Sequence, residues 1–420
     1  MRRFLILMCW LVLAGCANRS PVEPSIRGNE QFTPTVPIPE AVTTATTTAA
    51  YTAVPSDTVT PTFTVTPTAT QEPVYLQAVL WEEDPYTPIL NYHRFIPDRH
   101  PYSSGTKLRL SDFWSQLERL HAAGYSLISL DAYMNGDLRV PAGRRPLILT
   151  IDDAFFADQL SLTSDGQPSP RCGVGMLLEF SRQHPDFGFA VAMFANYGDK
   201  LFGNIETNDW WVLGEGWEDA LANTIAWGIQ NEVMPYNHLY LHPRLDLTDD
   251  QAIHSQAWLN DKALRDHLAR IGQEQLIAQV ENYIALPYGV WPATRGGRQL
   301  LMAYTDPEGR PVRAVLEAGY EYQPRFAPPP YAPEFDRFHL PRLSGIERSI
   351  NVLEEHSQAL PAAQLCEVGP FENSQPEKGE LLQVLAATVQ SGRCAQGVFI
   401  LESGVFRVQD GAAAAILLVD

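Results

Sequence analysis

The pattern of apolar and polar positions changes several times along the chain. Residues 4–13 are almost uniformly apolar, whereas residues 18–73 show no apolar periodicity. From Val74 to about Ser344, short apolar runs alternate with stretches in which apolar residues recur every three or four positions. This alternation predicts that strands and helices follow one another through the central part of the chain.

The individual elements follow from these runs. We expect strands at 88–93, 126–130, 146–151, 189–194 and 232–234. We expect helices at 111–123, 175–182, 217–229 and 249–283, the last with a break. Strands that alternate with helices favour a parallel α/β sheet or barrel. The last 70 or so residues differ, because a helical pattern is followed there by three short runs, at 397–401, 405–409 and 414–419, separated by glycines.

The first residues have the pattern of an export signal. Two arginines precede the apolar stretch, which ends in Leu13-Ala14-Gly15-Cys16. The stretch is too short to span a membrane as a helix. A cysteine after Leu-Ala-Gly resembles the bacterial lipoprotein signal, which implies cleavage before Cys16 and lipid attachment to it. An ordinary signal peptide with an incidental cysteine is the alternative. We therefore expect an extracytoplasmic, membrane-anchored lipoprotein of the bacterial cell envelope.

Composition adds three expectations. Residues 17–75 are rich in Thr and Pro, so they predict a disordered, extended stalk. Cys366 and Cys394 lie in one region and are candidates for a disulfide in an oxidising compartment, which leaves Cys172 over. The formal charge of -19 and the lack of a Lys/Arg cluster argue against a nucleic-acid partner.

Two short segments carry the candidate chemistry. Asp152 and Asp153 end a buried apolar run, and His238 and His242 are four residues apart, a spacing that places them on one side of a helical turn. One carboxylate and two histidines suffice to hold a divalent metal with a position open for water, while the second carboxylate serves as a base. The alternatives are a capping aspartate and incidental surface histidines. Leu239 excludes the metalloprotease helix, which needs Glu after the first His.

These segments resemble motifs of a known family. Thr150-Ile151-Asp152-Asp153-Ala154, His238…His242 and Ala285-Leu286-Pro287-Tyr288-Gly289 resemble, in this order, three motifs of the polysaccharide deacetylases with a NodB homology domain, which are family 4 carbohydrate esterases. Residues 88–93 and 340–343 also look like this family, and the resemblance covers roughly 88–344. The layout is most similar to poly-N-acetylglucosamine deacetylases with an early Tyr-His segment, here Tyr92-His93.

The resemblance implies a fold and a division of the chain. It implies a distorted (β/α) barrel of about seven parallel strands over residues 76–350. Residues 1–16 would be the signal, 17–75 the stalk, and 351–420 a small C-terminal appendage containing β-strands, whose role the sequence does not indicate.

The resemblance also implies roles for individual residues. Asp153, His238 and His242 would hold the metal, zinc by ligand type, although cobalt, nickel or iron suit the same set. Asp152 would be the general base and His93 the general acid, with His339 a second candidate acid. Pro287 and Tyr288 would contact the substrate and its oxyanion. The implied reaction is hydrolysis of N-acetyl groups on a surface polysaccharide containing N-acetylglucosamine.

Three departures from the motifs keep alternatives open. Ala154 replaces a glycine, Leu239 replaces a Ser or Thr, and the third motif lacks an arginine that orients the base in many members. A catalytically inactive protein that binds surface glycan is therefore one alternative. Another is a stalked adhesion or scaffold protein whose activity lies in the C-terminal unit.

Overall fold

The computed structural model describes residues 72–99, 106–198, 216–319 and 325–418. Cys16 and the predicted stalk up to residue 71 lie outside these residues. Within the described residues, no helix is both long enough and apolar enough to cross a membrane.

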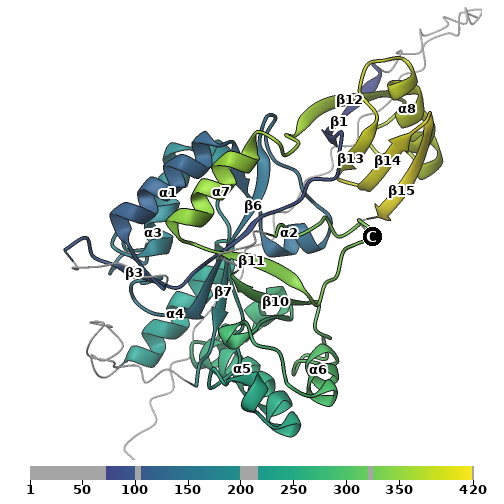
Figure 1. The fold of residues 1–420 in the computed structure, drawn as a ribbon. Coiled ribbons are helices and arrows are strands. Elements are labelled where there is room, and N and C mark those ends of the chain that lie inside the picture. The colour runs from purple at the N-terminus through teal and green to yellow at the C-terminus, as the bar shows by residue number, and fades with distance from the viewer. Residues whose placement is uncertain (1–71, 100–105, 199–215, 320–324, 419–420) are drawn as a thin grey trace, which may run out of the picture. The chain divides into compact units, whose positions relative to one another are not determined.

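A closed barrel of seven parallel strands forms the larger part of the described chain (Figure 1). Going round the barrel, the strands are β2 (Ile89–Tyr92), β11 (Leu340–Ser344), β10 (Ala314–Gly319), β9 (Tyr283–Ala285), β8 (Val233–Asn237), β7 (Val191–Ala195) and β6 (Arg145–Ala154). The pairing of β2 with β6 closes the ring. The predicted distorted (β/α) barrel is confirmed.

Strand β6 is the longest of the barrel and is shared between two neighbours. Its first part pairs with β5 (Tyr125–Leu127), and residues 148–151 pair with β2. Residues 146–152 are all buried, which explains the unbroken apolar run in the sequence. The strand therefore carries Asp152 and Asp153 to the carboxyl end of the barrel.

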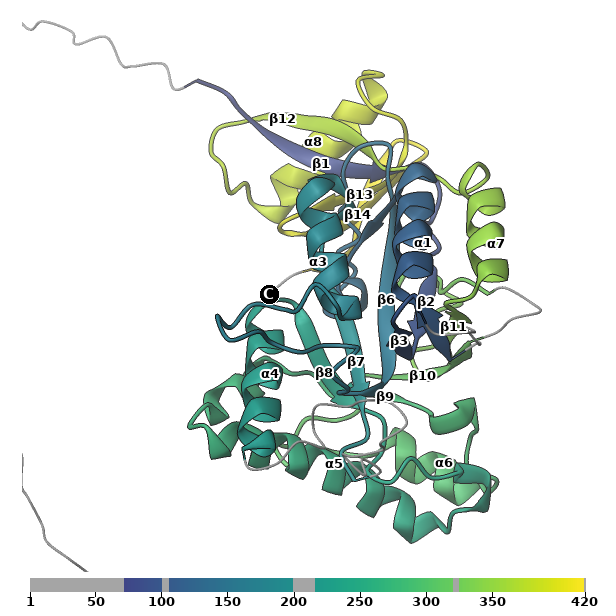
Figure 2. The ribbon, with the colours of Figure 1, turned by 90° about the vertical axis from the view of Figure 1, so that its left-hand side faces the viewer.

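Helices cover the outside of the barrel (Figure 2). They are α1 (Leu110–Ala122), α2 (Leu130–Met134), α3 (Gly173–Gln183), α4 (Trp217–Gln230), α5 (Asp250–Arg270), α6 (Arg295–Met302) and α7 (Glu347–Ser357). The break expected within 249–283 falls after Arg270, where α5 ends. A short 3₁₀ helix, Glu274–Gln279, then leads to β9.

The C-terminal part is an antiparallel sheet with one helix. Its strand order is β12 (Gln364–Phe371), β1 (Val74–Trp81), β13 (Gly397–Leu401), β14 (Gly404–Gln409) and β15 (Ala412–Leu418), and α8 (Lys378–Gln390) packs on it. The three strands expected here are present. The sheet also takes in β1, which the expected boundary assigned to the barrel domain, because a lone apolar run does not reveal its distant partner.

Helix α7 belongs with the barrel, although most of it falls beyond the expected boundary at residue 350. It packs against α1, where Arg119 bonds Glu347 and Glu354 at 2.5 Å each. The C-terminal sheet lies beside the amino end of β6, since Gly143 donates its backbone N–H to Ala363 O (2.8 Å). The sheet and the carboxyl ends of the strands are thus at different ends of the barrel.

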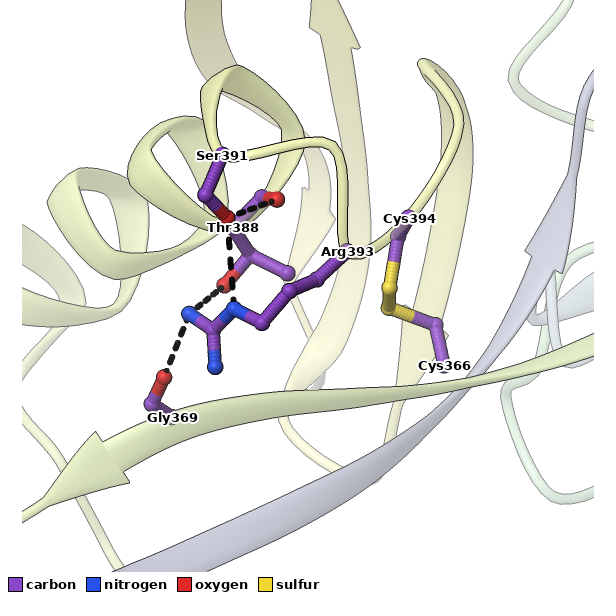
Figure 3. The surroundings of a disulfide bond; sticks show 6 residues. All are labelled: Cys366, Gly369, Thr388, Ser391, Arg393 and Cys394. Carbon is purple, nitrogen blue, oxygen red and sulfur yellow. Dashed lines mark hydrogen bonds between the residues drawn. A yellow bond between two sulfur atoms is a disulfide. The ribbon is translucent and has the colours of Figure 1, made fainter.

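A disulfide joins Cys366 on β12 to Cys394, which follows α8 (Figure 3). Next to it, Arg393 donates to Gly369 O (2.8 Å) and Thr388 Oγ1 (3.2 Å). The disulfide expected from the sequence is confirmed. Cys172 is the free cysteine of the described residues, and it is buried at the start of α3.

Candidate metal and catalytic site

The site is built from Asp152 and Asp153 at the end of β6. Asp152 is 3 % exposed, whereas the side chain of Asp153 is 30 % exposed. Asp153 has a φ of 55°, a left-handed conformation, and one oxygen of each carboxylate lies 3.8 Å from His238 Nε2. Asn196, just after β7, donates its Nδ2–H to Asp153 Oδ1 (3.1 Å).

Asp152 is held by a buried arginine from another strand. Arg342 on β11 is 1 % exposed and donates to both carboxylate oxygens, at 2.7 and 2.8 Å. Asn91 Nδ2 donates to Oδ2 as well, at 3.1 Å. Burial alone would raise the pKa of Asp152, but the charge and hydrogen bonds of Arg342, together with the two neighbouring histidines, outweigh burial and hold this pKa well below its usual range. Asp152 is therefore ionised.

Arg342 was missed as a site residue by the sequence analysis. Its signal was present, because a single arginine stands in the apolar run Leu340-Pro341-Arg342-Leu343, and a buried cation needs an anionic partner. The missing arginine of the third motif therefore has a counterpart on a different strand. A sequence alone does not show which strands lie across a barrel from one another.

His238 and His242 lie in the loop after β8, and the expected helical turn is wrong. Leu239 and His242 have positive φ values of 60° and 48°, so the backbone twists between the two histidines. Their ring centroids are nevertheless 4.8 Å apart. His242 Nε2 lies 3.4 Å from Asp153 Oδ1, and His238 Nε2 lies 3.8 Å from the same oxygen.

The environment of His238 indicates which nitrogen carries the proton. Its Nδ1 lies 2.9 Å from Ala285 O, a carbonyl that only accepts, so Nδ1–H donates to it. Burial lowers the pKa of His238 to about 4, although Asp152 and Asp153 oppose this shift. The ring is thus neutral, and Nε2 presents a lone pair toward the two carboxylates.

This arrangement fits a divalent cation. Donor atoms of Asp153, His238 and His242 all lie within 4.8 Å of one another. A lone pair that faces carboxylate oxygens is unfavourable unless a positive charge lies between them. A histidine whose other nitrogen donates to a backbone carbonyl is also the usual form of a metal-binding histidine. The structure brings the three predicted ligands together.

His93 follows β2 directly and lies next to Asp152. Gln159 Nε2 donates both to His93 O (2.7 Å) and to Asp152 O (2.9 Å), so one amide ties the two segments together. The Nδ1 atom of His93 is buried and has no hydrogen-bond partner within the described part of the chain. His93 is also close enough for its electrostatic interaction with Asp152 to contribute to the lowered pKa of that carboxyl.

Tyr288 lies on the open side of the site. Its side chain is 60 % exposed, and its ring centroid lies 4.5 Å from that of His242. Pro287, which precedes it, is buried. Tyr288 has a φ of 55°, so the turn after β9 projects the aromatic ring beside the histidine pair.

His339, the second candidate acid, has other partners. Its Nδ1 lies 2.9 Å from Glu317 Oε1, which also accepts from Trp291 Nε1 at 2.9 Å. Side chains alternate along a strand, so Glu317 lies on the same face of β10 as Val315 and opposite Leu316. Val315 packs in an apolar cluster with Trp291, whereas Leu316 belongs to the main cluster of the barrel. His339 thus bonds Glu317 and packs on Trp291, with ring centroids 4.8 Å apart.

Two of the departures from the motifs have a structural explanation. Ala154 is fully buried and is not among the described residues with positive φ, since the left-handed conformation falls on Asp153 instead. Leu239 is fully buried in the cluster formed by Leu245, Ile253 and their neighbours. Leu239 thus packs among apolar neighbours.

The comparisons with known proteins give likeness at the level of structure only. No family model and no curated protein sequence matches the chain. Among solved structures, the chain is similar to the Streptococcus pyogenes deacetylase PplD in complex with acetate (14 % identity, TM-score 0.41, 67 % of this chain and 98 % of that one). It is also similar to IcaB from Ammonifex degensii (16 %, 0.43, 66 % and 99 %). A third is BC0361, a polysaccharide deacetylase from Bacillus cereus (14 %, 0.40, 64 % and 69 %).

Proposed function

We propose that this chain is a metal-dependent hydrolase that removes N-acetyl groups from a polysaccharide containing N-acetylglucosamine. The observation that carries the proposal is the pairing of two adjacent carboxylates with different partners. Asp153 faces two histidines, whereas Asp152 is fixed by Arg342 and Asn91. Paired carboxylates in unlike environments are the arrangement by which a site separates a binding role from a proton-transfer role.

Asp153, His238 and His242 are the residues that would hold the cation, with zinc favoured by the ligand type. When bound, such a cation supplies Lewis acidity toward the amide carbonyl and the attacking water. The side chain of Asn196 orients Asp153, and Ala285 O orients His238. These hydrogen bonds hold the metal-ligating oxygen of Asp153 and the metal-ligating nitrogen of His238 in position.

Asp152 accepts the proton of the attacking water. A carboxylate offers about four acceptor positions. Two hydrogen bonds from Arg342 and one from Asn91 use three of them, which leaves one for the water. The low pKa keeps Asp152 ready as a base, and the fixed geometry compensates for its modest basicity.

His93 protonates the departing amine in this proposal. Its buried, unpartnered Nδ1 lies in the segment that Gln159 ties to Asp152, so base and acid share one support. Tyr288, exposed beside His242, offers an aromatic surface for a sugar ring, and in this proposal the turn at Pro287 and Tyr288 contacts the oxyanion. The products would be acetate and a free amino sugar.

A glycan-binding protein without turnover is the second candidate. In the sequence, Ala154 and the absence of an arginine from the third motif favoured this binding protein. Arg342 now provides a guanidinium at the base, and Ala154 does not occupy a position that requires glycine. Both observations favour the enzyme over the inactive alternative.

We also propose that the protein is an extracytoplasmic lipoprotein anchored through Cys16. The disulfide between Cys366 and Cys394 supports an oxidising compartment. Labelling with a radioactive fatty acid in a bacterial host tests the anchor. Incorporation that is lost in Cys16→Ser is expected, and equal labelling of this variant would contradict it.

The activity is tested by acetate release from N-acetylglucosamine oligomers and from peptidoglycan, using the full chain with chelator or with added zinc. We expect metal-dependent release that is lost in Asp152→Asn and in His238→Ala. Asp266→Asn is the matched control, because Asp266 is an exposed carboxylate on α5 that bonds Lys262. Equal release by Asp152→Asn and wild type would refute the assigned base, and bound metal without release would favour the binding protein.

A further inference from the structure

The loop that carries His238 and His242 is held by polar groups of helix α5. The central residue is Asn237, the last residue of β8, which is 2 % exposed. Its Oδ1 accepts from the backbone N–H of Leu239 at 2.8 Å, between the two histidines. Its Nδ2 donates to Ala257 O (2.9 Å) and to Asp261 Oδ1 (2.7 Å), both on α5.

A second residue of α5 fixes the other half of the same loop. Gln256 accepts from the backbone N–H of Tyr240 through its carbonyl oxygen (3.1 Å) and from that of Leu241 through Oε1 (2.7 Å). Three backbone N–H groups between the two histidines are therefore connected to α5. Those of Tyr240 and Leu241 donate to Gln256, and that of Leu239 donates to Asn237, which itself bonds α5. This explains how Leu239 keeps its positive φ without a local polar side chain of its own.

Asn260 connects α5 to the neighbouring strand end. Its Oδ1 accepts from Tyr197 N (3.0 Å), and its Nδ2 donates to Ala195 O (2.9 Å). Ala195 O also accepts from the backbone N–H of His238 at 2.8 Å. Through these bonds Asn260 connects to the segment that contains Asn196, the partner of Asp153. Through Ala195 O it also connects to the backbone of His238.

The burial of Asn260 at its position in α5 would be unfavourable if its amide were not hydrogen-bonded. It lies on the inward face of α5 among Ile253, Ala257, Leu264 and Leu268, and it is 1 % exposed. An apolar residue would suit that stripe better, because a buried amide must have all its hydrogen bonds satisfied. Both polar atoms of Asn260 are hydrogen-bonded to the backbone at the end of β7, where Ala195 O also accepts from His238 N.

We propose that Asn237, Gln256, Asn260 and Asp261 form a polar clamp through which α5 sets the spacing of the metal ligands. These are positioning residues, since none of them belongs to the ligand set. Asp261 is itself anchored, because Tyr304 donates its hydroxyl to Oδ2 at 2.6 Å. The inference rests on the proposed metal site and adds what determines its geometry.

The test measures zinc affinity of the full chain by competition with a chromophoric chelator, in Asn260→Asp and Asp261→Asn. Asn260→Asp removes the donor to Ala195 O, and Asp261→Asn replaces the carboxylate that accepts from Asn237 and Tyr304 by an amide with one, weaker acceptor, with little change in volume. We expect zinc to bind about 10–100-fold more weakly, as for groups that support metal ligands elsewhere. Asp266→Asn, the same chemical change on the exposed side of α5, is expected to bind zinc as the wild type does.

The visible spectrum of the cobalt-loaded protein adds a readout that a merely structural role would not move. A changed absorption in the two variants, each folded by circular dichroism, is expected. Gln256→Ala is a milder variant in case the others do not fold, and a several-fold loss of affinity is expected for it. If the folded variants have the zinc affinity and the cobalt spectrum of the wild type, the clamp is refuted and the metal site is not. If the wild type binds no metal, the metal site itself is refuted.

Discussion

The two ends of the barrel are built differently. At the carboxyl ends of the strands, buried polar side chains hold one another through hydrogen bonds, as Asp152, Arg342 and Asn91 do. At the amino end, the antiparallel sheet relies on apolar packing, with Val79 and Ile400 in the same cluster as the barrel core, and on the disulfide. One region holds buried charged groups in fixed positions, and the other stabilises the chain by apolar packing and a covalent crosslink.

Backbone strain is distributed in the same way. Of the six described non-glycine residues with positive φ, four belong to the site, namely Asp153, Leu239, His242 and Tyr288, and Glu232 lies in the turn before β8. Asp410 belongs to the C-terminal sheet, where Asp410-Gly411 forms the tight turn between β14 and β15 that this dipeptide favours. The strain in the sheet follows from local sequence, whereas the strain in the site is maintained by tertiary contacts.

The largest expected effect concerns the base. Asp152→Asn keeps the size of the side chain but cannot accept the proton, so we expect kcat for acetate release to fall by about 10²–10⁴-fold. Zinc content, measured by mass spectrometry, should stay at the wild-type level because Asp152 is not a ligand. Loss of metal together with activity would place Asp152 in the ligand set instead.

Arg342→Met breaks the pair that holds the base. It leaves a buried carboxylate without its cation, and we expect the free energy of unfolding in urea to fall by about 3–5 kcal/mol. The double variant Arg342→Met with Asp152→Asn should recover much of this loss, because no buried charge remains. An unchanged midpoint in the single variant would mean that the pair does not stabilise the barrel.

Cutting the disulfide affects the other region. Cys366→Ser with Cys394→Ser opens a loop with a sequence separation of 28 residues. The chain-entropy model then gives a loss of about 3.6 kcal/mol in stability. Acetate release at low temperature should be unchanged, because neither cysteine contacts the site. A proportional loss of activity would show that the two ends of the barrel are coupled.

A smaller expected effect is a pH dependence of stability that arises from Asp261, on the helix that holds the loop of His238 and His242. Burial raises the pKa of Asp261 to about 7, with Asp306 adding to the shift and Arg310 opposing it. Between about pH 4 and 7 the folded chain therefore holds a proton that the unfolded chain releases. This contribution to stability is present at low pH and is lost as pH rises through the folded pKa.

Asp261→Asn removes that titration. The difference in free energy of unfolding between wild type and variant should be largest near pH 4–5 and shrink toward pH 8. Urea unfolding of the metal-free proteins across this range measures it. A difference that is constant with pH would show that Asp261 does not titrate there.

Much of the fold was predictable because parallel strands that are buried on both faces leave long apolar runs, as in β6. The placement of β1 was not, since its partners β12 and β13 lie about 290 and about 320 residues away. In the site, Asp152 and Asp153 were found from their position after such a run. The local conformation around His238 was wrongly predicted, because the spacing of four suits a helix and the clamp from α5 imposes a loop instead.

The central claim is that Asp153, His238 and His242 hold a metal beside Asp152. The most direct test is the zinc K-edge absorption spectrum of the full chain loaded with one zinc ion. We predict scattering from two imidazoles and from oxygen ligands, with one imidazole lost in His242→Ala. A spectrum with sulfur ligands or without imidazole, or one that does not change in His242→Ala, would contradict the assignment.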